Sequence, residues 1–123
     1  KLTHSLLRVQ YYFFTSFFKF APKYRADGAL LIQAHPFRNK CTPAPAELLD
    51  GVEVLNLNPR HDSHNDLALA YAEEHHLLMT AGSDCHRPGD EGTTGILAET
   101  LPEDSFGYAD LIRSGKYTLI RPE

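Results

Sequence analysis

From Asp27 onward, apolar runs of strand length alternate with segments that have helical spacing. We expect strands at residues 29–35, 52–56, 77–84 and 117–121, and helices at residues 43–51, 67–76 and 106–115. A Gly-rich loop is expected at residues 87–95. This alternation predicts an α/β fold with a mostly parallel sheet. A chain of 123 residues has room for one domain at most.

Polar residues gather where the first three expected strands end. His35 ends the first strand, residues 53–56 lie in or end the second, and residues 84–86 end the third. In parallel sheets, functional groups collect at the carboxyl ends of the strands. Three consecutive strands therefore deliver side chains of metal-ligand type to one edge of the predicted sheet.

The sequence TAGSDCH, residues 80–86, carries an acid and an imidazole two positions apart. In an extended chain, Asp84 and His86 point to the same side, and Cys85 points away. A carboxylate and a neutral imidazole suit zinc, manganese or iron. The alternative is an ordinary loop in which Asp84 caps a turn and His86 faces solvent, because short patterns often occur by chance.

The sequence AHPFR, residues 34–38, follows a buried apolar run. Pro36 is expected to hold His35 in an extended conformation. Arg38 could offer a bidentate guanidinium to a phosphate group. The alternative is a hydrogen-bonded histidine at a strand end beside a surface arginine.

The sequence GVEVLN, residues 51–56, gives a weaker signal. By simple alternation, Glu53 and Asn56 cannot both face the site. Glu53 lies between two valines, and a carboxylate there needs a partner. An inward ion pair or an edge position is the preferred interpretation over direct metal ligation.

The remaining histidines carry less information. His75 and His76 fall at the end of an expected helix, where the helix dipole favours a positive charge. His61 and His64 lie in a loop next to Arg60, where they could contact a substrate.

The bulk properties narrow the classes of partner. The formal net charge of −4 gives no electrostatic support to nucleic-acid binding, but local Arg or Lys could still recruit a phosphorylated substrate. Two cysteines outside any CxxC pair indicate reduced thiols in a cytoplasmic protein. The apolar stretch 11–20 is shorter than the roughly 20 residues that span a bilayer, so no membrane partner is expected. We expect this stretch to form a core helix or strand.

The segments AHPFR, GVEVLN and TAGSDCH, in that order, resemble the C-terminal half of the PHP (polymerase and histidinol phosphatase) domain family. EGTTGI and LIRSGKYTLI extend the likeness, which covers residues 27–122. The resemblance implies a distorted (β/α)₇ barrel, like a TIM barrel, with up to three divalent metal ions at the strand ends. It also implies hydrolysis of a phosphate ester, on a phosphorylated small molecule or nucleotide, by a metal-activated water.

The resemblance also assigns roles to particular residues. His35, Asp84 and His86 would be metal ligands, Asp84 and His86 would act in catalysis, and Arg38 would contact the substrate phosphate. Members of the family begin with an H-x-H strand, and no segment here matches it. Residues 1–26 are therefore expected to be an aromatic and basic remnant of the first half of the domain, and residues 27–123 its C-terminal portion.

Two alternatives stay open. The chain could be a non-catalytic PHP-like module that serves structure or interaction, because the ligand set is incomplete. It could also be a hydrolase of another α/β family that holds a single metal ion with His35, Asp84 and His86 alone.

Overall fold

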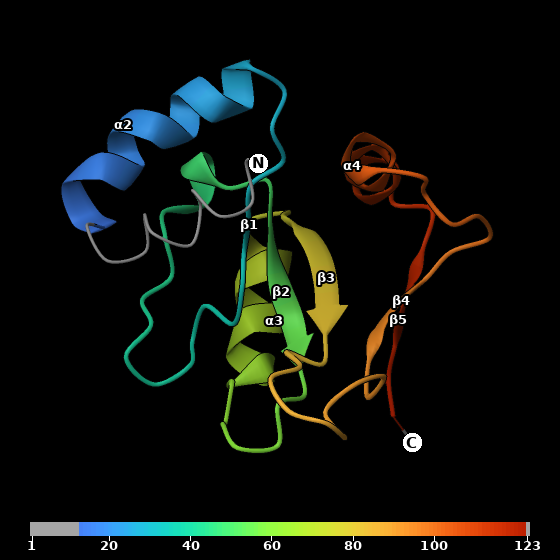
Figure 1. Ribbon diagram of the computed structural model, residues 1–123. Helices are drawn as coiled ribbons and strands as arrows, with labels where there is room; N and C mark the ends of the chain where they lie inside the picture. Colours follow the sequence, from blue (N-terminus) through green and yellow to red (C-terminus); the bar gives the residue numbers. More distant parts are fainter. Residues whose placement is uncertain (1–12, 123) are drawn as a thin grey trace.

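The structure, a computed structural model, describes residues 13–122 and has an α/β fold (Figure 1). Its elements in chain order are α2 (Phe13–Ala26), β1 (Ile32–Gln33), the 3₁₀ helix η1 (Ala46–Leu48), β2 (Gly51–Asn56), α3 (Asn65–Glu74), β3 (Leu78–Gly82), β4 (Gly95–Leu97), α4 (Ser105–Ser114) and β5 (Thr118–Ile120).

A three-stranded parallel sheet lies at the centre of the fold, in the order β1-β2-β3. Gly51 at the start of β2 pairs with Ile32 on one side and with Leu78 on the other. The strands approach so closely there that a Cβ on Gly51 would lie 2.5 Å from the Leu78 carbonyl oxygen and 2.6 Å from Ile32 Cδ1. The sheet confirms the predicted parallel arrangement, and it requires glycine at this position.

The last strand departs from the prediction of one mostly parallel sheet. A strand does form within residues 117–121, but β5 pairs antiparallel with β4, and the two make a separate sheet. The start of β4 falls in the segment that the sequence indicated as a Gly-rich loop, because a three-residue strand shows no readable periodicity. Within residues 13–122, the strands form two sheets beside each other and no closed barrel (Figure 1).

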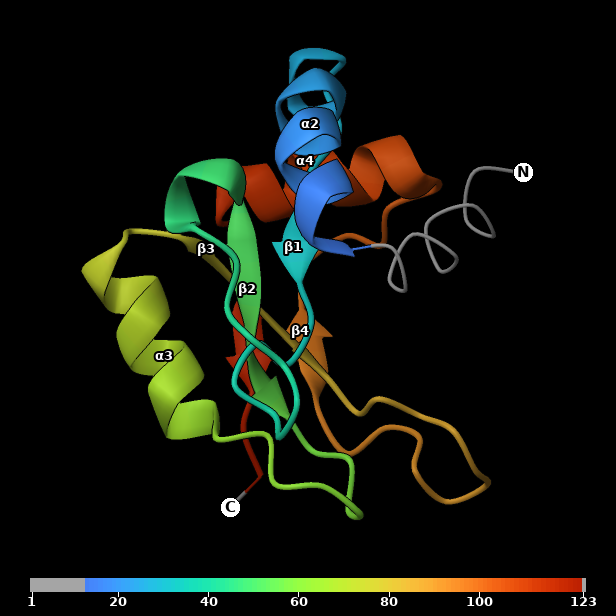
Figure 2. The ribbon, with the colours of Figure 1, turned by 90° about the vertical axis from the view of Figure 1, so that its left-hand side faces the viewer.

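The helices cover the parallel sheet and lie near the residues predicted for them. α3 packs against β2 (Figure 2). Its Ala68 and Ala72 are fully buried. Asp104 is the N-cap of α4, and its side chain accepts a hydrogen bond from the Gly107 amide at 2.8 Å; Gly115, with a φ of 67°, is the C-cap. Both are regular helix ends, with an acidic N-cap and a left-handed glycine C-cap.

The helix expected at residues 43–51 is only the three-residue η1. The backbone becomes extended at Leu49, where ψ is 152°, and the Leu49 side chain is buried in the core. Asp50 then accepts hydrogen bonds from the Leu31 amide and from Arg25. A longer helix would bring Leu49 and Asp50 out of these contacts.

The hydrophobic core joins α2 to the sheet. Phe17 and Ala21 of α2 are buried with Val52, Val54 and Ala72. Residues 13–20 of the apolar stretch 11–20 thus form part of a core helix, and the rest of that stretch, like His4, lies outside the described residues. None of the described helices is long and apolar enough to cross a membrane.

Candidate functional site

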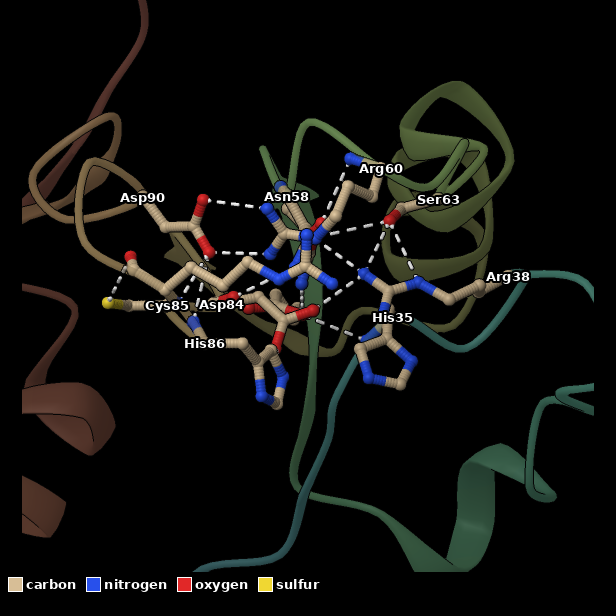
Figure 3. Close-up of polar contacts among 12 residues, drawn as sticks. His35, Arg38, Asn58, Arg60, Ser63, Asp84, Cys85, His86 and Asp90 are labelled. Carbon is tan, nitrogen blue, oxygen red and sulfur yellow. Dashed lines mark hydrogen bonds and ion pairs between the residues drawn. The ribbon is translucent and has the colours of Figure 1, made fainter.

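Arg38 belongs to a polar cluster at the carboxyl edge of the parallel sheet, where it lies beside Ser63 and His35 (Figure 3). Its Nη2 donates hydrogen bonds to Asn56 Oδ1 at 2.7 Å, Asp84 Oδ2 at 2.8 Å and Ser63 Oγ at 2.9 Å. Its Nε also donates to Ser63 Oγ, at 3.3 Å. The side chain is only 12% exposed. Arg38 therefore connects the segments at the ends of β1, β2 and β3, the edge at which the sequence predicted polar residues to gather.

The other terminal nitrogen of Arg38 is unused. No residue in the described range accepts a hydrogen bond from Nη1, although a guanidinium carries five N–H donors. No described side-chain nitrogen or oxygen is both fully buried and without a hydrogen bond, so Nη1 retains contact with solvent. A cationic donor held in place on one side and open on the other can bind an anionic oxygen.

Asp84 and His86 come together, as the sequence TAGSDCH predicted. Asp84 Oδ1 lies 2.9 Å from His86 Nε2. Strand alternation does not explain why the two side chains meet, because β3 ends at Gly82 and Asp84 adopts a left-handed φ of 51°. Burial acts to raise the pKa of Asp84, but hydrogen bonds, first of all from Arg38, outweigh it and bring that pKa below its usual range. Asp84 is thus a carboxylate at neutral pH, shared between a guanidinium and an imidazole.

Glu53 and Asn56 both reach the site, which corrects the expectation from alternation. Asn56 Nδ2 donates to Glu53 Oε2 at 2.9 Å. The pairing of β2 with β3 shifts register between Glu53 and Leu55, and this irregularity breaks the alternation of side chains. The partners of Glu53 are an amide side chain and the His35 backbone N–H, at 2.9 Å, rather than a cation. Burial raises the pKa of Glu53 above its usual range.

His35 does not have the extended conformation expected before a proline. Its φ is 32°, in the left-handed region, and the Arg38 amide donates to its carbonyl oxygen at 3.2 Å. This turn, held by the Glu53 carboxylate on the His35 amide, outweighs the local preference of the residue before Pro36. The turn places Arg38 over the end of the sheet. The distance from His35 Nδ1 to Cys41 Sγ is 3.7 Å.

An ion pair between Arg60 and Asp90 holds the loop that carries His86, and no sequence pattern indicates this pair. The two terminal nitrogens of Arg60 contact the two carboxylate oxygens of Asp90 at 2.9 Å and 2.5 Å. Asp90 also accepts from the amides of His86 and Arg87, both at 3.0 Å. The hydrogen bonds from Arg60 hold the pKa of Asp90 well below its usual range. Asp90 fixes the backbone next to the Asp84–His86 pair.

Two further side chains, those of Asn58 and Ser63, connect the loops of the cluster. Neither of them was predicted from the sequence. Asn58 donates from Nδ2 to the Asp84 carbonyl oxygen at 2.9 Å, and it is 3% exposed. Ser63, equally buried, links Arg38 to Asn56. Their only sequence signal was a loop rich in turn-forming residues between β2 and α3.

The histidines near α3 lie as expected. His75 is the C-cap of α3, and His76 follows it, both exposed and away from the cluster. His61 and His64 lie in the loop with Arg60, beside Arg38 and Lys40.

The predicted metal ligands are only partly assembled. Asp84 and His86 offer donors that suit a transition metal, but Arg38 and His86 already occupy both carboxylate oxygens. His35 contacts Cys41 instead. Across the part of the chain that the structure describes, no group of three or more His, Cys, Asp or Glu is arranged to hold a metal ion. Metal ligation by His35, Asp84 and His86 therefore stays a prediction.

Residues 62–113 match the family model described as PHP-associated. We call this segment the PHP-associated region, after the family model that it resembles. The match confirms the resemblance of the sequence to the C-terminal region of a PHP domain. No curated protein and no solved structure matches the chain.

The PHP-associated region supplies one side of the cluster. It contains Ser63, Asp84, His86 and Asp90, whereas Arg38 lies in the segment before it. The hydrogen bonds from Arg38 to Ser63 and Asp84 therefore join the PHP-associated region to the turn after β1.

Proposed function

We propose that the chain takes part in the hydrolysis of a phosphate ester, with Arg38 as the group that binds the phosphoryl oxygens. The observation that carries this proposal is the open Nη1 of a buried, rigidly held guanidinium at the carboxyl edge of a parallel sheet. Arginine binds phosphate through paired N–H donors, and fixed cations stabilise the charge of a phosphoryl group during transfer. The match to a PHP-associated region supports the same reaction class.

The other residues have distinct parts in this proposal. Asp84 orients Arg38 through Oδ2 and holds His86 Nε2 through Oδ1, which leaves the other ring nitrogen of His86, Nδ1, for proton transfer. The resemblance to PHP domains implies divalent zinc, manganese or iron ions at His35, Asp84 and His86, which would supply Lewis-acid chemistry. The described residues hold no such set of three donors, so this part of the proposal rests on the family resemblance.

The test is hydrolysis of p-nitrophenyl phosphate by the purified chain, supplied in turn with zinc, manganese and iron(II). We expect activity with at least one metal, and we expect Asp84→Asn and His86→Asn each to lower kcat/KM by about 10²-fold or more. Metal content is measured in the same samples. His75→Asn is the matched control, because His75 is exposed at the end of α3.

Unchanged hydrolysis in Asp84→Asn and His86→Asn would contradict the assignment of these residues. Absence of both bound metal and hydrolysis in the unmodified chain would contradict the enzymatic proposal itself.

A second candidate function is a non-catalytic PHP-like module for structure or interaction. The observation in its favour is that both carboxylate oxygens of Asp84 contact protein side chains, those of Arg38 and His86. Arg38 would then be a structural cation that holds three loops. The metal and hydrolysis measurements above separate the two candidates.

A further inference from the structure

A cavity of about 580 Å³ opens beside Arg38. This volume is in the range of small-molecule sites, roughly 300–1,000 Å³, and it exceeds what a single phosphoryl group needs. The loops after β1 and β2 form its walls, and the charged or titratable residues among them are Arg38, Lys40, Arg60, His61, Asp62 and His64. Figure 3 shows Arg38, Ser63 and Arg60 gathered near the end of β2.

The charge of this cavity is predominantly positive. Three permanent cations line it, against one carboxylate, that of Asp62. Arg38 and Arg60 are held by Asp84 and Asp90, two acids that do not line the cavity. Lys40 is exposed and has no ion-pair partner among residues 13–122. Two fixed guanidinium groups and one free ammonium group therefore face the same space.

The backbone at the cavity also departs from ordinary conformations. Lys40 has a φ of 70° and His64 a φ of 47°, both in the left-handed region. A hydrogen bond of 2.7 Å from the Cys41 amide to the Arg38 carbonyl oxygen closes the turn around Lys40. Such conformations in non-glycine residues cluster at ligand sites, where the surrounding contacts enforce them. The turn places Lys40 two residues from Arg38, on the same wall.

We propose that this cavity binds a second phosphoryl group of the substrate, while Arg38 holds the first. The inference rests on the proposed function for the role of Arg38, and it narrows the substrate class to small molecules that carry two phosphoryl groups. Lys40 is the specificity residue, because a mobile ammonium group suits phosphate as a point charge. The side chain of His61, exposed and without a hydrogen-bond partner among residues 13–122, adds a second contact from the opposite loop.

The experiment compares the binding of orthophosphate and pyrophosphate to the purified chain by isothermal titration calorimetry, with a chelator present so that no metal mediates binding. Pyrophosphate is expected to bind at least about tenfold more tightly than orthophosphate, because one added charge-assisted hydrogen bond lowers the Kd by about that factor. Lys40→Gln with His61→Asn should remove most of that difference and leave orthophosphate binding unchanged. Lys23→Gln, an exposed lysine in the last turn of α2, is the control.

Equal affinities for the two anions, or a pyrophosphate affinity that survives Lys40→Gln with His61→Asn, would overturn the inference. An equal loss in Lys23→Gln would show general charge attraction and would overturn it as well. This binding test is independent of turnover, so a failure here is distinct from an absence of metal-dependent hydrolysis, which would contradict the proposed function.

Discussion

Replacement of Arg38 by alanine is expected to lower the free energy of unfolding by about 2–3 kcal/mol. Arg38 and Asp84 have side chains that are 12% and 16% exposed, so the pair is largely removed from water. Without the guanidinium, Asp84 keeps a buried negative charge, and Asn56 Oδ1 loses its shortest donor. Loss of one partner of a fully buried pair costs about 3–5 kcal/mol, and the residual exposure of this pair reduces that figure.

Urea unfolding at neutral pH measures the effect of Arg38→Ala. Arg121→Ala is the matched control, because Arg121 is exposed and has no ion-pair partner among the described residues. Its change should stay within about 0.5 kcal/mol. A loss in Arg38→Ala no larger than in Arg121→Ala would show that Arg38 does not hold the three strand ends together.

Replacement of Ile112 by alanine is expected to cost about 2–5 kcal/mol of stability. Ile112 of α4 is fully buried and has one of the largest fully buried side chains in the described part of the chain. Its truncation removes apolar contacts and leaves a cavity where α4 covers the sheets. Because Ile112 lies within the PHP-associated region, the change also tests whether α4 belongs to the cooperative fold.

Ile120→Ala provides the comparison for Ile112→Ala in the same denaturant experiment. Ile120 of β5 is 44% exposed, so its truncation should cost well under half as much. Similar losses for the two variants, or a small loss for Ile112→Ala, would mean that α4 does not pack as described.

The elements that could be predicted from sequence are those with long, regular patterns. The run at residues 52–56 appears as β2, buried almost throughout, and LALAYAEEHH contains most of α3. Each has enough residues for its period to be read. The short antiparallel pair of β4 and β5 could not be foreseen, because its partners are three residues long and its register depends on tertiary contact.

The sequence predicted where the candidate site lies in the sheet better than it predicted the backbone conformation there. The rule that polar groups gather at the carboxyl ends of parallel strands placed His35, residues 53–56 and residues 84–86 at one edge, where Glu53 contacts the His35 amide and Asp84 contacts His86. The left-handed turn at His35 and the register shift after Glu53 were missed, since both arise from hydrogen bonds between distant segments. Asp90 was missed because an acid in a Gly-rich loop has the sequence signature of an ordinary turn.

The most direct test of the central claim, that Arg38 binds a phosphoryl group, is an orthophosphate titration followed by ¹H–¹⁵N spectra of the arginine side chains. We predict a saturable shift of the Arg38 guanidinium signals, with the signals of the exposed Arg121 unchanged. Arg38 signals that do not move at saturating phosphate, or that move no more than those of Arg121, would contradict the account.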